Sequence, residues 1–179
     1  LKSPAFFKDM CAHCCEPLKT DAGFLGRLKN TFLIRNPSRA IPSYYAMNPD
    51  VTNEEVGIEQ LHTIFQVVAD TTGATPVVVD ATDLENDPDG IMAAYCKAVD
   101  IPFIQDAMTW EESHREEWDI WKEWHKDAAQ STGIKKNMEV FEQDTTNNDH
   151  LKRLYDFQYP YYEALYRHRI KPVPVLSVG

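Results

Sequence analysis

The sequence predicts an α/β fold: a parallel sheet with flanking helices, incomplete within this chain, and a helical last third. Two short apolar runs support it, residues 31–34 and 76–80, because continuous apolar segments of this length are typical of strands buried on both faces. The helical pattern between them is long enough for a crossover, which parallel strands require. We therefore expect a single α/β domain over residues 1–179.

Helix signals flank the first strand. The pattern before it predicts a helix over residues 3–18, with Pro17 as its stop. Directly after the strand, Asn36 can cap a second helix, and Pro37 suits the first helical position because no amide hydrogen bond is lost there. We expect Pro42 to disturb this second helix within two turns, because proline interrupts the helical hydrogen bonds.

The crossover to the second strand begins at a capping box. Thr52 can accept a hydrogen bond from the amide of Glu55, whose carboxylate reaches back. From there to Gly73, a typical helix stop, apolar residues recur at helical spacing and give the predicted helix one apolar face. Those residues are Leu61, Ile64, Phe65 and Val68.

The chain after the second strand predicts further helices. One opens at Pro88, capped by Asn86 or Asp87. The last runs over residues 148–172, with Pro160 bending it and a proline ending it. A buried seam explains the tyrosines of this last helix, which are Tyr155, Tyr159, Tyr161, Tyr162 and Tyr166.

Charge and composition exclude several classes of partner. Lysine and arginine total 18 against 28 aspartates and glutamates, which gives a net charge of −10. Such an acidic surface repels phosphate backbones, so we expect no nucleic-acid partner. No apolar run approaches the length of a membrane span, and the chain shows no secretory leader. We therefore expect a soluble, cytoplasmic protein with no membrane partner.

The segment of residues 11–15 is rich in potential metal ligands: Cys11, His13, Cys14 and Cys15. One interpretation is a zinc-dependent interaction module. A structural zinc site usually takes four ligands as two separated pairs, however, and no second pair follows. The other interpretation is that the cysteines are small, reduced, apolar residues on the buried side of a helix. We expect the second interpretation and no metal.

The end of the first strand is the candidate binding site. In open α/β sheets, ligands bind outside the carboxyl ends of the strands, where helix N-termini present amides and the positive ends of their dipoles. Arg35 follows the first strand, and Ser43 lies eight residues on, in the helix that begins there. A guanidinium and a hydroxyl beside a helix N-terminus suit a phosphate group.

The same segment resembles a known family. Residues 31–45, TFLIRNPSRAIPSYY, resemble the element with which sulfotransferases hold the 3′-phosphate of 3′-phosphoadenosine 5′-phosphosulfate (PAPS). VVVDATDLENDP is similar to a later strand element of that family, and YPYYEALYRHRIKP to the closing helix of its bacterial and fungal branch. The resemblance implies a P-loop NTPase-like three-layer fold, PAPS as co-substrate, and 3′-phosphate contacts from Arg35 and Ser43.

Two parts of the family pattern are missing. The glycine-rich loop that holds the 5′-phosphosulfate has no counterpart among the glycines of this chain, and the usual catalytic base would lie upstream of Leu1. We therefore expect this chain to be the C-terminal part of a longer protein. A two-stranded parallel sheet is not stable alone, so we expect an upstream segment or a second polypeptide beside the first strand. As a separate matter, a homo-oligomer stays open.

The resemblance also suggests candidate roles for a few other polar residues. A late glycine-lysine segment of the family corresponds loosely to STGIKKNMEVF, which makes Lys135 a candidate 3′-phosphate contact; the alternative is that Lys135 and Lys136 are simply exposed. We interpret Asp80, Asp83 and Asp87 as a strand end, a turn and a helix cap, in preference to ligands.

Residues 113–133 predict one more helix, in which Trp118, Trp121 and Trp124 recur every three residues. Such a stripe winds round the helix, and two interpretations are open. The tryptophans pack in the core, as large aromatics usually do. Alternatively, Trp121 lines a pocket for an apolar acceptor, and His125 serves there as an acid or base near neutral pH.

Two functions are compatible with these features. The first is a sulfotransferase that binds the 3′-phosphate of PAPS and moves a sulfuryl group to a hydroxyl or amine of a small molecule. No residue of this chain is identifiable as its catalytic base. The second is a scaffold that has lost sulfuryl transfer and acts as a binding protein or in another step of small-molecule metabolism.

Overall fold

The structure is a computed structural model, and it describes residues 5–112, 129–136 and 139–175, with the backbone alone at residues 12 and 13. The chain divides into two compact units. The first, residues 1–80 and 140–169, contains α1 (Cys11–Thr20), α2 (Ala22–Leu25), β1 (Thr31–Ile34), α3 (Pro37–Met47), α4 (Asn53–Val56), α5 (Ile58–Thr72), β2 (Val77–Asp80) and α9 (Asp149–Tyr166). The second, residues 81–139 and 170–179, contains α6 (Ala81–Asn86), α7 (Pro88–Val99) and the 3₁₀-helix η1 (Gln105–Met108).

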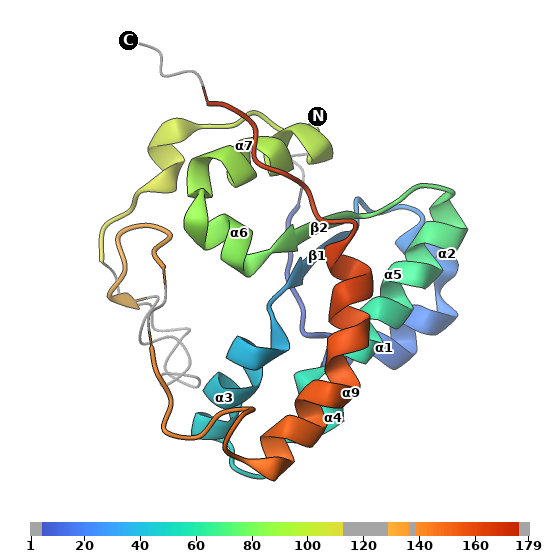
Figure 1. The fold of residues 1–179 in the computed structure, drawn as a ribbon. Coiled ribbons are helices and arrows are strands. Elements are labelled where there is room, and N and C mark those ends of the chain that lie inside the picture. The colour runs from blue at the N-terminus through green and yellow to red at the C-terminus, as the bar shows by residue number, and fades with distance from the viewer. Residues whose placement is uncertain (1–4, 113–128, 137–138, 176–179) are drawn as a thin grey trace. The chain divides into compact units, whose positions relative to one another are not determined.

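The fold is α/β, as predicted, and its sheet is formed by β1 and β2 in parallel. In the register of the two strands, Ile34 lies opposite Asp80. Helices α5 and α9 cover one face of the sheet (Figure 1). The core on that face consists of Phe32, Ile34 and Val78 from the strands, Ile64, Phe65 and Val68 from α5, and Tyr162 and Leu165 from α9.

The opposite face of β1 differs from the prediction that both faces are buried. Ile34 is 2% exposed and Phe32 is also buried, but Leu33 between them is 60% exposed. β2, in contrast, is buried over its last three residues. The backbone of Val78 also forms a parallel bridge with Arg169 beyond β2. Within the described ranges, no strand or bridge pairs with the outer edge of β1.

Two helices tolerate prolines that were expected to end or disturb them. α1 begins eight residues later than predicted and continues through Pro17. α3 continues through Pro42, which is buried, and does not end until Met47. Each proline removes one helical hydrogen bond. Packing of α1 against α5, and of α3 against α9, compensates for the missing bond in each helix.

The predicted capping box is confirmed, although it opens a shorter helix than expected. The amide of Glu55 donates to Thr52 Oγ1 at 3.3 Å, and the amide of Thr52 donates to Glu55 Oε2 at 2.8 Å. α4 then ends at Val56, and Gly57 follows it with a left-handed φ of 72°, a conformation that favours glycine. α5 begins directly afterwards and ends at Gly73, as predicted, again with a left-handed φ.

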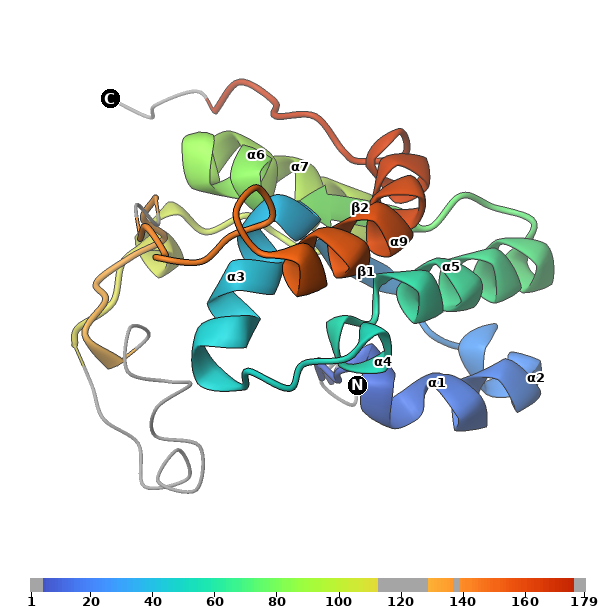
Figure 2. The ribbon, with the colours of Figure 1, turned by 60° about the horizontal axis from the view of Figure 1, so that its bottom comes forward.

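The long helix α9 lies between α3 and α5 (Figure 2). It passes through Pro160 and ends at Tyr166, earlier than predicted, because the chain turns there and brings Arg169 to β2. Its tyrosines pack on the hydrophobic clusters of the first unit, as predicted. Neither α9 nor any other helix in the described part of the chain has the length and apolar character that a membrane crossing needs.

The second unit begins with a helix where a turn was expected. Asp83 lies in α6, and Asp87 caps α7 by accepting a hydrogen bond from the amide of Gly90 at 3.0 Å. In the same unit, Trp110 Nε1 donates to Ser131 Oγ at 3.1 Å. Most of the helix predicted over residues 113–133 lies outside the described residues, so that prediction stays untested.

Candidate functional site

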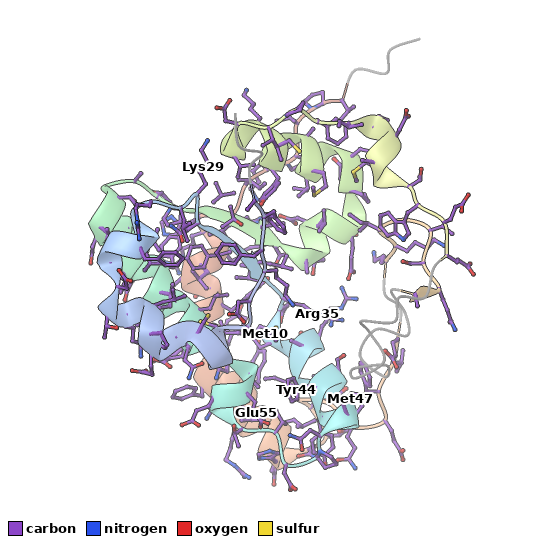
Figure 3. All side chains as sticks on the ribbon, turned by 180° about the vertical axis from the view of Figure 1, so that it is seen from behind. Met10, Lys29, Arg35, Tyr44, Met47 and Glu55 are labelled. Atoms are coloured by element: carbon purple, nitrogen blue, oxygen red, sulfur yellow. The ribbon has the colours of Figure 1, made fainter. Side chains whose placement is uncertain are left out.

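The predicted anion-binding residues lie at the junction of β1 and α3. β1 ends at Ile34, Arg35 follows, and Asn36 caps α3 by accepting a hydrogen bond from the amide of Ser38 at 2.9 Å. Pro37 occupies the start of the helix, as expected. Figure 3 shows Arg35 at this end of β1, next to the first turn of α3. The strand, the cap and the proline together fix where the arginine leaves the sheet.

The environment of Arg35 suits an anion. The residue is half-buried, and its Nε nitrogen is buried. It stands beside the N-terminus of α3, whose aligned peptide dipoles amount to roughly +0.5 of an elementary charge at that end. Two positive sources therefore coincide in a chain whose net charge is −10. Partial burial strengthens such charge interactions, because water screens them less.

Ser43, the second predicted phosphate contact, lies in the middle of α3 and is half-buried. A helix completes a turn in about 3.6 residues, so the step from Asn36 to Ser43 returns to nearly the same side of α3, about 10 Å along its axis. Arg35 and Ser43 are thus parts of one continuous strand–helix element. Their joint contact with a single phosphate stays a prediction.

The other predicted site residues lie elsewhere in the chain. Lys135 and Lys136 belong to the second unit, and both side chains are exposed, as the alternative interpretation expected. A phosphate contact from Lys135 stays a prediction. Trp121 and His125 lie outside the described residues, so their proposed roles toward the acceptor also stay predictions.

The end of β2 holds a polar pair that the sequence analysis missed. Asp80 is 2% exposed and Tyr162 of α9 is 6% exposed, and the tyrosine hydroxyl donates to Asp80 Oδ2 at 3.0 Å. Burial, and after it the negative charge of Asp80, raises the pKa of Tyr162 well above its usual value. The one sequence signal was an aspartate at the end of an otherwise apolar strand.

Two of the three cysteines of α1 pack in the core, as the packing interpretation expects. Cys15 is buried and donates to the carbonyl of Gln60 at 3.9 Å, and Cys11 packs against the same core. Burial, helped by the neighbouring thiols, raises the pKa of Cys11 to about 12, and burial also raises the pKa of Cys14. Among the described side chains, which do not include that of His13, no group of three potential ligands is placed to hold a metal.

Comparison with known proteins gives the family. A family model described as a sulfotransferase domain matches residues 2–168. Two curated proteins of Arabidopsis thaliana, "Branched-chain-amino-acid aminotransferase-like protein 1" and "Branched-chain-amino-acid aminotransferase-like protein 2", are 31% identical over 111 residues and 30% identical over 107 residues. These alignments cover 62% and 59% of this chain.

The relatives are much longer than the region they share with this chain. The chain spans about a fifth of the length of the curated relatives it matches, 20% and 19% respectively. No solved structure matches the chain significantly. The family model, in contrast, extends from before α1 to beyond the end of α9 and includes both strands and the Arg35 junction. The chain belongs to the sulfotransferase domain family.

Proposed function

We propose that this protein binds the 3′-phosphate of PAPS through Arg35 and Ser43. The observation that carries the proposal is the position of Arg35, at the carboxyl end of a parallel strand and beside the capped N-terminus of α3. A guanidinium offers a fork of donors that matches phosphate oxygens, and the helix adds its positive end. The family supports a sulfuryl donor as the source of that phosphate.

In the natural protein, the proposed reaction is sulfuryl transfer to a small-molecule hydroxyl or amine. The acceptor atom bonds to sulfur while the bond from sulfur to the 5′-phosphate oxygen breaks, and adenosine 3′,5′-bisphosphate leaves. The acceptor proton goes to a base that is not among the residues assigned here. The contribution of Arg35 and Ser43 is to position the donor, which lowers the barrier by fixing its orientation.

Calorimetric titration of the natural protein with adenosine 3′,5′-bisphosphate tests the proposal. Hydrogen bonds to a charged group contribute about 1.5–3 kcal/mol, so Arg35→Ala should weaken binding by about tenfold to a hundredfold. Arg39→Ala is the matched control, because it removes the same charge from the first turn of α3. Equal affinities of Arg35→Ala and the unmodified protein would contradict the proposal.

We also propose roles for Lys135, Trp121 and His125, which the sequence analysis singled out. We expect Lys135→Ala to weaken bisphosphate binding less than Arg35→Ala, because its side chain is exposed. For Trp121 and His125 we propose contacts with the acceptor. Trp121→Ala should then raise KM for the acceptor and leave the affinity for the bisphosphate unchanged, whereas the opposite pattern would remove Trp121 from the acceptor pocket.

The names of the relatives favour a second candidate function. The matching region is a small part of two proteins named as aminotransferase-like. A scaffold that has lost sulfuryl transfer and serves as a binding domain in another step of small-molecule metabolism fits that setting. Failure of the natural protein both to bind the bisphosphate and to form sulfated product from labelled PAPS would favour this second function.

The outer edge of β1 supports the proposal that the sheet has a further strand. We propose that a further strand, from an upstream segment or from a second polypeptide, pairs with β1. In the described part of the chain, no strand or bridge pairs with the outer edge of β1, and two four-residue strands are too few for a stable parallel sheet. Amide hydrogen exchange on the natural protein should then show slow exchange along both edges of β1, and sedimentation would show whether a second copy supplies the strand.

A further inference from the structure

The buried pair of Asp80 and Tyr162 lies next to the proposed phosphate site. Asp80 ends β2 and is the register partner of Ile34, the residue before Arg35. Paired residues of neighbouring strands are about 4.8 Å apart. The pair therefore lies one residue away from Arg35 along the carboxyl edge of the sheet. Any shift of this edge moves the backbone from which the guanidinium extends.

Helix α9 connects this pair to the other half of the proposed site. The first half of α9 packs on α3, where Leu151 and Leu154 form a buried cluster with Ile41. The second half reaches the sheet, where Tyr162 bonds to Asp80. Figures 1 and 2 show α9 extending from α3 to the strands. The helix thus contacts α3, which contains Ser43, and β1, which ends one residue before Arg35.

The two ends of α9 are held by different kinds of contact. The contacts with α3 are hydrophobic, and hydrophobic contacts have no preferred direction. The hydrogen bond from Tyr162 has a preferred distance and angle, so it fixes the rotation and height of α9 against β2. An apolar pair of similar shape would stabilise the fold about as well. What the polar pair adds is a defined orientation of α9 against β2.

The surroundings of the pair keep the tyrosine protonated as a donor. Burial and the charge of Asp80 both raise the pKa of Tyr162, and the nearby charge of Arg169 lowers it by a smaller amount. The Arg169 guanidinium lies 3.4 Å from the centre of the Tyr166 ring, and Nη1 donates to the Tyr166 carbonyl at 2.9 Å. At neutral pH the Tyr162 hydroxyl is therefore protonated and donates its hydrogen bond to Asp80.

We infer that Asp80 and Tyr162 are positioning residues for the 3′-phosphate site: their hydrogen bond holds α9 in the one placement that sets α3, and so Ser43, relative to Arg35. This inference rests on the proposed function. It assigns the pair no contact with the nucleotide. Its role is to limit the relative movement of the two elements that contact the phosphate.

The test compares two nucleotides on the natural protein. Adenosine 3′,5′-bisphosphate carries the 3′-phosphate and adenosine 5′-phosphate lacks it. Tyr162→Phe removes only the hydroxyl, and calorimetry should show affinity for the bisphosphate falling by about threefold to tenfold, the range of one net hydrogen bond. Affinity for adenosine 5′-phosphate should not change. A merely structural role would lower both affinities together.

Two further variants separate orientation from charge and from packing. Asp80→Asn keeps an oxygen that can accept from Tyr162 but removes the charge, so it should retain the bisphosphate affinity. A role through charge would instead tighten binding of the anion in Asp80→Asn. Tyr159→Phe removes a hydroxyl from a half-buried tyrosine three residues away on α9 and should leave both affinities unchanged.

The outcomes distinguish this inference from the proposed function. If the unmodified protein binds no bisphosphate, the proposed function is wrong and the inference falls with it. If the unmodified protein binds and Arg35→Ala binds at least tenfold more weakly, but Tyr162→Phe binds normally, the proposed function stands and the inference is wrong. Circular dichroism of each variant is the control that tests whether the fold is retained.

Discussion

The two strands of the sheet have equal length and lie side by side, but they differ in burial and in the contacts at their ends. β1 has one buried face, an exposed Leu33, and a half-buried cation after its last residue. β2 is buried over its last three residues, ends in a buried carboxylate that α9 holds, and is bridged beyond its far edge by Arg169. The difference teaches that β2 is enclosed on its buried side and at its end, whereas β1 is enclosed on one face and carries a half-buried cation after its last residue.

The largest predicted loss of stability concerns the two faces of β1. Ile34→Ala should lower the free energy of unfolding by about 2–5 kcal/mol, because it leaves a cavity in the core shared with α5 and α9. Leu33→Ala should cost less than about 0.5 kcal/mol if solvent covers that side. Urea titration measures both losses. A Leu33→Ala loss approaching that of Ile34→Ala would show that another element packs on this face of β1, and a neutral Ile34→Ala would contradict the core assignment.

An intermediate effect is expected at the end of β2. Asp80→Ala leaves the Tyr162 hydroxyl buried without its acceptor, which should cost about 1–3 kcal/mol of unfolding free energy. The double variant with Tyr162→Phe should cost less than the sum of the single variants, since both remove the same bond. Thermal unfolding of the four proteins in this cycle gives the coupling. Strictly additive losses would show that the hydrogen bond contributes nothing.

The smallest effect concerns pH. The pKa of Tyr162 is raised in the folded protein, so the folded state retains this proton after tyrosine in the unfolded chain has lost it, at a pH of about 10. Stability should therefore decline as pH rises above about 10, and Tyr162→Phe should flatten that decline. Denaturation curves between neutral and alkaline pH measure the slope.

A second tyrosine provides the comparison for the pH prediction. Tyr44 lies in α3, the helix that follows β1, and burial together with the charge of Glu55 raises its pKa as well. We expect Tyr44→Phe to flatten the alkaline decline less than Tyr162→Phe. The reverse order would mean that folding raises the pKa of Tyr44 more than that of Tyr162.

Features encoded by neighbouring residues could be predicted from the sequence. The bounds of β1, the cap and proline that open α3, the capping box at Thr52 and the stop at Gly73 all depend on residues within one or two turns of each other. The position of Arg35 at the β1–α3 junction follows from the same local signals. The position of this residue could therefore be predicted from the sequence alone.

Features that depend on distant partners could not be predicted. The acceptor of the Tyr162 hydroxyl lies 82 residues earlier in the chain, so the sequence showed only an apolar seam of tyrosines. The prolines of α1 and α3 were expected to stop or disturb their helices because propensity is local, whereas packing on α5 and α9 is not. The exposure of Leu33 was missed for a related reason: a short apolar run does not show how many of its faces are covered.

The first unit is assembled from two separate stretches of chain, residues 1–80 and 140–169. During synthesis, both strands therefore leave the ribosome before α9, which completes the cover of their apolar face. Until residues 81–139 have been translated, the half-covered sheet is open to chaperones and to wrong pairing with other nascent chains. The yield of folded protein should accordingly depend on the speed of translation through that intervening stretch, and synonymous codons that slow it should increase the demand for chaperones.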